Sequence, residues 1–300
     1  MNAIEIRNLS KSFRGMYAVD HLNMTVPVGA IYGFIGENGS GKSTTEKLIC
    51  GHLVPDGGEI KLFGKDYTDA GVRVRVGALI ENTGCFPGSS VWDNLMMQAI
   101  NLGLKNPKEE IHRVLKIVRM EENAKIKFKS CSLGMKQRIG IAMALLGNPA
   151  LLILDEPING LDADGCRIMR EILLDITHNY GCTVVISSHI LGELEKIATH
   201  YGIIRQGKMI SEISAKDMES RCRNFTSLKT KDMQGAKKAL SQKFPIVKEE
   251  DGYIRVYDVD DTETIVDYLM KNGYPVSEIK KNKIGLEEYY IELMSKKEAN

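Results

Sequence analysis

The stretch GENGSGKST, residues 36–44, constrains the fold of this chain more than any other part of its sequence. It matches the pattern G-x-x-x-x-G-K-[ST] of a phosphate-binding loop through Gly36, Gly41, Lys42 and Ser43. An apolar run at residues 30–35 predicts a strand before the loop, and a helix-compatible run follows it. A glycine-rich turn formed by chance would lack this combination. The pattern therefore predicts a nucleotide-binding fold built on a strand, a loop and a helix.

Each part of this loop has a chemical task. The glycines let backbone N–H groups turn inward around phosphate oxygens, and the N-terminus of the following helix adds partial positive charge. Lys42 would place its ammonium group on the outer phosphates, and the Ser43 hydroxyl can ligate Mg²⁺. The residues predicted to hold the nucleotide phosphates are Gly36, Asn38, Gly39, Ser40, Gly41, Lys42, Ser43 and Thr44.

A second chemical signal is the stretch LLILDEP, residues 151–157. Its continuous apolar run predicts a buried strand of a parallel sheet, and α/β sheets bind ligands beyond the carboxyl ends of such strands. Asp155 is placed there to ligate Mg²⁺, and Glu156 to polarise an attacking water as a general base. Adjacent acids that merely cap the following turn are the alternative, which the upstream phosphate loop disfavours.

The remaining pattern predicts an α/β protein with a second, smaller domain. Residues 182–189 form another buried strand, and the helical pattern between the two buried strands completes a β-α-β unit. Short strands dominate residues 2–35, whereas apolar spacing of three and four predicts helices from about 88 to 148. We expect a P-loop NTPase core at 1–215, with a mostly parallel sheet, an antiparallel β subdomain and a helical subdomain. A small α+β domain is expected at 216–300.

Composition and charge exclude several other classes. The hydrophobic fraction of 43% and charged fraction of 26% are those of an ordinary globular protein. The net charge of +1 argues against a nucleic-acid partner. The six cysteines lack metal-ligand spacing, which predicts free thiols in a reducing compartment. No signal-peptide core opens the chain, and no apolar run approaches the roughly 18–20 residues of a membrane span. We therefore expect a chain that does not cross a membrane, although it can dock against a protein that does.

The stretch SLGMKQR, residues 132–138, predicts the start of a helix with Ser132 as its N-cap. A helix N-terminus can bind an anion, but nothing in this spacing says which anion. One apolar stripe along the helix is predicted to consist of Ile139, Ala142, Met143 and Leu146.

Taken in order, the phosphate loop and the stretches SLGMKQ, LLILDE, NGLD and SSH resemble the motifs of the nucleotide-binding subunit of an ABC transporter. The resemblance covers residues from about 4 to 210. It implies that two subunits, here expected to be two copies of this chain, pair head to tail and enclose two ATP molecules with Mg²⁺. It also implies that the helical subdomain docks an integral-membrane permease subunit. The chain would then be cytoplasmic and peripheral on the inner face of the cell membrane.

The resemblance also supplies the anion that the SLGMKQ helix lacked, because this helix would face ATP held by the Lys42 loop of the other subunit. The residues that would make this contact are Ser132, Gly134, Met135 and Gln137.

Further roles follow from the same resemblance. Asp162 in NGLD would lie at the dimer seam, and His189 would reach the γ-phosphate and help to orient the water. Without the family, a histidine after a strand is more often structural. An aromatic side chain would stack on adenine, with Phe13 as the first candidate and Tyr17 as the second. A strand residue packed in the core is the alternative for Phe13.

The strand VGALIENTG, residues 76–84, ends on an acid where most of the family has glutamine. We assign this position to Glu81, with Asn82 as the alternative register. A carboxylate only accepts hydrogen bonds and carries a full negative charge, so it should bind Mg²⁺ more tightly than an amide does. The resemblance to the lantibiotic-protection group, which has an acid here, predicts Glu81 as a Mg²⁺ ligand and coupling residue.

The stretches YGFIGENGSGKSTT, ALIENTGCFPGSSVWDNL and EPINGLDADG most resemble exporters of the bacitracin and lantibiotic self-protection type. We therefore expect the ATPase of an exporter of peptide antibiotics. One alternative is the same ATPase with another cargo, such as a lipid, a polysaccharide or a drug. Another is a soluble ABC ATPase acting on ribosomes or DNA, which usually has two cassettes or long coiled-coil arms; this sequence has neither.

Overall fold

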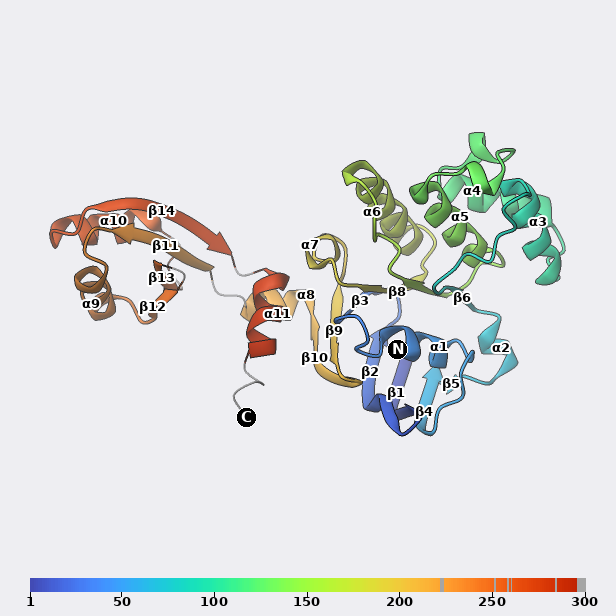
Figure 1. The fold of residues 1–300 in the computed structure, drawn as a ribbon, viewed down its shortest axis with the longest axis horizontal. Helices are drawn as coiled ribbons and strands as arrows, with labels where there is room; N and C mark the ends of the chain where they lie inside the picture. Colours follow the sequence, from blue (N-terminus) through green and yellow to red (C-terminus); the bar gives the residue numbers. More distant parts are fainter. Residues whose placement is uncertain (222–223, 251, 258, 260, 284, 296–300) are drawn as a thin grey trace. The chain divides into compact units, whose positions relative to one another are not determined.

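The computed structural model describes residues 1–221, 224–250, 252–257, 259, 261–283 and 285–295. The chain divides into two units, Met1–Ala215 and Lys216–Asn300 (Figure 1). Each unit has a hydrophobic core of its own.

The strands that lead into the predicted site residues belong to one six-stranded sheet. Its order is β10-β9-β3-β8-β7-β6, and all neighbours pair in parallel except the edge strand β10. Strands β3 and β8 are buried along their whole length, and β7 up to its last residue, in keeping with their continuous apolar runs. The strands are β3 (Ile31–Ile35), β6 (Val76–Leu79), β7 (Leu151–Asp155), β8 (Thr183–Ser188), β9 (His200–Arg205) and β10 (Lys208–Ser214).

A four-stranded antiparallel sheet of order β2-β1-β4-β5 shares one core with the six-stranded sheet, and helix α1 contributes to that core (Figure 1). Leu48 and Ile49 of the helix belong to the same apolar cluster as Ile4 of β1 and Ile153 of β7. This packing fixes the helix that follows the phosphate loop. The elements are β1 (Asn2–Phe13), β2 (Met16–Pro27), α1 (Lys42–Ile49), β4 (Gly57–Leu62), β5 (Lys65–Asp66) and the short α2 (Ala70–Arg73).

Helices α3, α4 and α5 gather at one end of the first unit (Figure 1). The second half of α5 is buried on nearly every side, so its buried surface is wider than the single apolar stripe predicted from the sequence. The reason is that α5 packs against both other helices and against strands β6 and β7. The elements are α3 (Val91–Asn101), α4 (Pro107–Ile117), η1 (Glu121–Asn123), η2 (Phe128–Ser130) and α5 (Leu133–Leu145).

Helix α6 (Ala163–His178) connects β7 to β8 and completes the predicted β-α-β unit, and the short α7 (Leu191–Leu194) follows β8. The two sheets with their helices confirm the predicted α/β fold class, including the antiparallel β part.

The second unit is an antiparallel sheet of order β12-β13-β11-β14 with helices α9 and α10 packed on it. From β11 to β14 its chain order is β-α-β-β-α-β, the split βαβ arrangement, with α8 before it and α11 after it. The elements are α8 (Ala215–Arg221), β11 (Asn224–Thr230), α9 (Met233–Lys243), β12 (Val247–Glu250), β13 (Tyr253–Tyr257), α10 (Thr262–Lys271), β14 (Val276–Lys283) and α11 (Leu286–Ser295).

Two further expectations concern the whole chain. In the described ranges, every helix is too short or too polar to cross a bilayer. Five of the six cysteines are free thiols, and Cys222 lies outside the described residues. Burial raises the pKa of Cys50 and of Cys182 to about 12, so these two thiols stay protonated.

Candidate functional site

The phosphate loop passes from β3 into α1, and two of its glycines leave no room for a side chain. Gly41 has a φ of +111°, and a Cβ there would lie 2.4 Å from the backbone oxygen of Ala18. A Cβ on Gly36 would lie 2.5 Å from the backbone oxygen of Ile204. Because both neighbours are backbone, a larger residue at either position would push the loop away from β2 or β9.

Lys42 is buried at the base of this loop, with 6% of its surface exposed. Its Nζ donates hydrogen bonds to the carbonyl oxygens of Gly36, at 2.6 Å, and Glu37, at 3.1 Å. The same nitrogen lies 3.9 Å from a carboxylate oxygen of Glu156. Two carbonyl groups of the loop therefore hold the Lys42 ammonium in a fixed position at the centre of the loop.

The two acids at the end of β7 face the loop through a chain of hydrogen bonds. Ser43 Oγ donates to Asp155 Oδ2 at 3.0 Å, and Ser187 Oγ, from the end of β8, donates to Asp155 Oδ1 at 2.7 Å. The backbone N–H of Glu156 donates to Ser187 Oγ at 3.1 Å. Glu156 itself has a left-handed backbone with φ of +49°, a conformation that concentrates at functional sites. The neighbouring strand end thus orients the Asp155 carboxylate and fixes the backbone of Glu156.

These residues surround a cavity of about 220 Å³, here called the phosphate-loop cavity. It is lined by Ala18, Asn38, Gly39, Gly41, Lys42, Ser43, Thr44, Asp155 and Glu156. Gly36 and Ser40 of the predicted set do not line it.

The donors in this cavity fit Mg²⁺. The Ser43 hydroxyl and the Asp155 carboxylate are hard oxygen donors only 3.0 Å apart, and Mg²⁺ typically takes one or two protein oxygens and fills its shell with phosphate and water. Within the described residues, no group of three His, Cys, Asp or Glu side chains could hold a metal by itself. The protein's share of a Mg²⁺ site would therefore be Ser43 and Asp155, completed by a nucleotide.

A second cavity, of about 350 Å³, forms where α5 and α6 begin, here called the Ser132 cavity. Ser132 caps α5 by accepting a hydrogen bond from the Met135 N–H at 3.3 Å, which confirms its predicted capping role. Asp162 caps α6 by accepting from the Gly165 N–H at 2.8 Å. Ser132, Gly134 and Asp162 all line this cavity, whereas Met135 and Gln137 lie on α5 outside its wall. The two cavities have no lining residue in common.

Known proteins place this arrangement in a family. The sequence pattern of the ABC transporter family matches residues 19–159. The bacitracin transport ATP-binding protein BcrA of Bacillus licheniformis is 37% identical over 297 residues, which is 97% of this chain and 97% of that protein. The lantibiotic transport ATP-binding protein SrtF of Streptococcus pyogenes is 39% identical over 70% of this chain and 90% of its own length. This chain belongs to the ATP-binding subunits of ABC transporters.

A solved structure of an ATP-binding subunit of an ABC transporter supports the same conclusion. It has 27% identity and a TM-score of 0.64, and the match covers 73% of this chain and 92% of that chain. The family resemblance seen in the sequence is therefore confirmed. The reaction of this subunit is ATP hydrolysis, and its family binds ATP, typically with Mg²⁺.

In this ABC subunit, His189 lies next to Glu156, the predicted general base. Its Nδ1 is 2.9 Å from Glu156 Oε2, and about half of the imidazole is exposed. The contact brings His189 to the edge of the phosphate-loop cavity, in a position to orient Glu156.

Both aromatic candidates for the adenine lie on the β1–β2 hairpin and are exposed. Phe13 is 46% exposed and Tyr17 58% exposed, so the alternative of Phe13 as a core residue is wrong. Tyr17 precedes Ala18, which lines the phosphate-loop cavity, whereas Phe13 pairs with Met16 near the hairpin turn. Both rings are exposed to solvent, and Lys11 Nζ lies 5.7 Å from the centroid of the Phe13 ring.

Glu81 lies apart from the other predicted metal ligands. It does not line the phosphate-loop cavity, and its Oε1 pairs with Lys47 Nζ at 2.5 Å. The backbone at Glu81 is left-handed, with φ of +62°, and its side chain is 57% exposed. Asn82, the alternative register, donates its N–H to the Ile80 carbonyl at 2.7 Å and tightens the turn around Glu81.

Two residues of this site were not predicted. Ser187 belongs to the stretch SSH, in which only His189 received a role. Glu46 is an acid at an apolar position of α1, and it is fully buried with neither carboxyl oxygen meeting the geometry of a hydrogen bond. Burial, and then repulsion from Asp155, raise the pKa of Glu46 to about 8, although Ser187 and Lys42 act in the opposite direction. An acid within an apolar helical stripe is the signal that would have revealed it.

Proposed function

We propose that this chain is the ATP-driven motor of an exporter for peptide antibiotics of the bacitracin and lantibiotic kind. The named relatives support this cargo class, because one carries out bacitracin transport and another lantibiotic transport. The chain would act as a peripheral subunit on the inner face of the cell membrane, paired with a second ATPase subunit and with membrane permease subunits.

One observation carries the proposed mechanism: the phosphate-loop cavity and the Ser132 cavity are separate half-sites on one chain. The first offers a lysine, a helix N-terminus and two acids. The second offers another helix N-terminus at Ser132, which is suited to an anion. Two copies arranged head to tail would bring each Ser132 cavity onto the triphosphate held by the other copy, and ATP would then join the two halves.

The chemistry follows from the residues around the phosphate-loop cavity. The loop N–H groups and Lys42 bind and orient the phosphates, and Asp155 with Ser43 would hold Mg²⁺, which neutralises phosphate charge when bound. Glu156 accepts the proton of the attacking water, and His189 keeps that carboxylate in position. After hydrolysis the shared anion is divided, so the contact that held the halves together weakens.

Mixed pairs of two defective chains test the head-to-tail arrangement. Lys42→Ala removes the charge of the phosphate loop, and Ser132→Arg fills the other half-site. In a mixed pair of these variants, one composite site carries both defects and the other carries neither. We expect each variant alone to be inactive. In an equimolar mixture about half of the pairs are mixed and each of these keeps one of its two sites, so the mixture should recover up to about a quarter of the activity of the unchanged protein. A mixture without activity, in which pairing is demonstrated, would contradict the arrangement.

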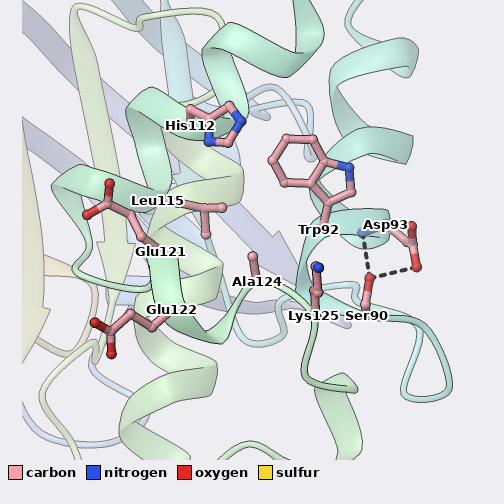
Figure 2. Close-up of a pocket in the computed structure, with 9 residues that line it drawn as sticks. All are labelled: Ser90, Trp92, Asp93, His112, Leu115, Glu121, Glu122, Ala124 and Lys125. Atoms are coloured by element: carbon pink, nitrogen blue, oxygen red, sulfur yellow. Dashed lines mark hydrogen bonds between the residues drawn. The ribbon is translucent and has the colours of Figure 1, made fainter.

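A pocket in the helical part supports the docking of a permease. It has a volume of about 690 Å³ and lies among α3, α4 and η1 (Figure 2). The ring of Trp92 lies 4.9 Å from that of His112, and Leu115 adds apolar surface. Figure 2 also shows two hydrogen bonds at the start of α3, in which Ser90 Oγ accepts from the Asp93 N–H and donates to the Asp93 carboxylate.

The carboxylates around this pocket favour a basic partner. Asp93, Glu121 and Glu122 line it together with a single lysine, Lys125. We infer that a short permease segment with an apolar face and basic flanks fits here. Trp92→Ala should abolish co-purification with the permease and leave the ATPase rate of the isolated chain unchanged. Leu102→Ala, which changes an exposed apolar residue of the same helical part, serves as the matched control.

The cargo is tested in a sensitive bacterium that carries this chain and its co-purifying membrane subunit. We expect the inhibitory concentrations of bacitracin and of a lantibiotic to rise, and Lys42→Ala to abolish the increase. Protection against unrelated drugs alone would assign the motor to another cargo and leave the ATPase mechanism intact.

A further inference from the structure

Strand β14 forms one edge of the sheet in the second unit. In the described part of the chain it pairs with β11 alone, so its outer side has no neighbouring strand there (Figure 1). Residues 277–281 of β14 are all exposed, whereas residues 225–228 of β11 are buried. In an antiparallel pair, alternate residues direct their N–H and C=O groups away from the partner strand. This edge can therefore accept a further strand.

The side chains of β14 alternate between the two faces of this sheet. Ile279 lies opposite Leu228, which belongs to the core formed with α9 and α10, so Ile279 lies on the helix-covered face. It is 37% exposed, which leaves apolar surface at the edge. Glu278 and Lys280 lie on the opposite face, where Glu278 is 3.9 Å from Lys229 of β11.

The charges along β14 complement each other in one antiparallel register. Two copies of one strand pair around a two-fold axis, which places one residue opposite its own counterpart. With the axis at Ile279, Glu278 of each copy faces Lys280 of the other. With the axis at Glu278 or at Lys280, two like charges would face each other, which destabilises a strand pair. Lysines at a sheet edge usually hinder pairing, but this order of charges favours pairing about Ile279.

The opposite edge of the sheet is less suited to a second copy. Strand β12 has only four residues, and an axis at either of its central residues, Lys248 or Glu249, would bring like charges face to face. Pairing of β14 with β12 of another copy would continue from copy to copy without closing. A closed pair of chains therefore requires β14 on both sides.

We propose that the second unit is a pairing module, in which β14 of one chain joins β14 of a second copy antiparallel about Ile279. The contact is short, because a register shift beside residue 277 ends the regular pairing of β14. Stable interfaces bury about 1,200–2,000 Å², so a contact of this size forms without ATP only at high protein concentration.

The use of this contact rests on the proposed function, whereas the contact itself does not. Two chains that have closed on ATP separate again after hydrolysis. A β14 contact would keep them near each other and so raise the effective concentration of one first unit around the other for the next cycle.

Cysteine cross-linking of the full chain without nucleotide tests the register. Ile279→Cys places two thiols opposite each other, with Cα atoms about 4.5–5.5 Å apart, which suits a disulfide. Lys281→Cys is the matched control, because residue 281 is exposed on the same face of the same strand. In the proposed register its two copies are about 13 Å apart along the strands. Under mild oxidation at high protein concentration, we expect dimers from Ile279→Cys alone. Equal cross-linking of both variants, or of neither, would overturn the register.

Charge variants test the two Glu278–Lys280 contacts. Lys280→Glu alone and Glu278→Lys alone each place like charges face to face at two positions, so self-pairing in sedimentation should weaken by about fivefold or more. An equimolar mixture of the two variants brings opposite charges together again at both positions and should recover pairing. A mixture that pairs no better than its components would contradict the proposal.

A further comparison separates this contact from the closure of the first units on ATP. Ser132→Arg should weaken ATP-driven pairing at low protein concentration but leave the cross-linking of Ile279→Cys unchanged. The cross-linked chains should keep their ATPase activity, and at low concentration they should exceed the reduced chains, which must first find each other. A loss of activity that reduction reverses would overturn the use of the contact between cycles. Absent cross-linking with intact ATP-driven pairing would reject the β14 contact and leave the proposed motor standing.

Discussion

The phosphate-loop cavity and the Ser132 cavity lie on the same unit, yet they are built in opposite ways. In the first, Lys42 is buried and Asp155 is tied to two serine hydroxyls, so the charged groups are fixed in place. In the second, side-chain oxygens of Ser132 and Asp162 accept hydrogen bonds as the N-caps of two helices. The first half-site is preorganised by its own chain, whereas the second presents a helix N-terminus of the kind that can bind an anion.

The largest effect is expected where the preorganised cavity meets the chemistry. Glu156→Gln keeps the size of the side chain and removes its basicity, so the rate of ATP hydrolysis should fall by about 10³-fold, within the range of a lost general base. ATP binding should persist, and chromatography with ATP should reveal a stable pair of chains. Turnover close to that of the unchanged protein would contradict the general-base role. Glu59→Gln, at an exposed acid on β4, is the matched control.

The open half-site should fail at pairing rather than at nucleotide binding. In a head-to-tail pair, Ser132→Arg would place a cation opposite the Lys42 of the other copy, and like charges at an interface cost several kcal/mol. ATP-driven pairing should therefore weaken by about 100-fold, whereas the affinity of a single chain for ATP stays the same. Both quantities come from sedimentation and from a fluorescent nucleotide. Ser130→Arg, two residues earlier and exposed, should leave pairing intact; equal loss in both variants would point to a general charge effect.

Burying a carboxyl group beside the preorganised cavity lowers the stability of the fold, and Glu46 makes this loss measurable. Burial raises the pKa of this carboxyl from its ordinary value of 4.5 to about 8. Below pH 4.5 the group is protonated in both the folded and the unfolded chain, so it carries no penalty. Between pH 4.5 and about 8 only the unfolded chain releases the proton, and the free energy of unfolding falls as the pH rises. The slope is about 1.4 kcal/mol per pH unit, a tenfold change in the folding equilibrium.

Glu46→Gln should remove this dependence and flatten the stability curve between pH 5 and 8. Chemical denaturation of the protein and the variant across that range measures the two slopes. Glu59→Gln, which changes an exposed acid, should keep the slope of the unchanged protein. Parallel curves for Glu46→Gln and the unchanged protein would show that Glu46 ionises normally in the folded chain.

The sequence predicted the preorganised half-site better than the open one, for a physical reason. A phosphate loop and an acid pair at a strand end are local patterns, and β3, β7 and β8 bring them together through ordinary parallel pairing. The grouping of Ser132 with Asp162 depends on two helices that begin side by side, which no spacing within either stretch encodes. Likewise, the ion pair of Glu81 with Lys47 joins residues 34 apart, so it could not be predicted from the strand that ends at Glu81.

The smallest effect is expected at the hairpin that borders the preorganised cavity, where Phe13 and Tyr17 compete for one role. Stacking of a base on an aromatic ring is worth about 1–3 kcal/mol, so the correct alanine variant should weaken ATP binding by at least about fivefold. Inorganic tripolyphosphate has no base to stack, and its binding should be unaffected. Met16→Ala, at the exposed residue opposite Phe13, is the control.

If Phe13→Ala weakens the binding of ATP but not of tripolyphosphate, Phe13 holds the adenine. If only Tyr17→Ala does so, the residue next to Ala18 holds it instead. Equal losses for both ligands would show that the hairpin shapes the phosphate loop rather than the base site.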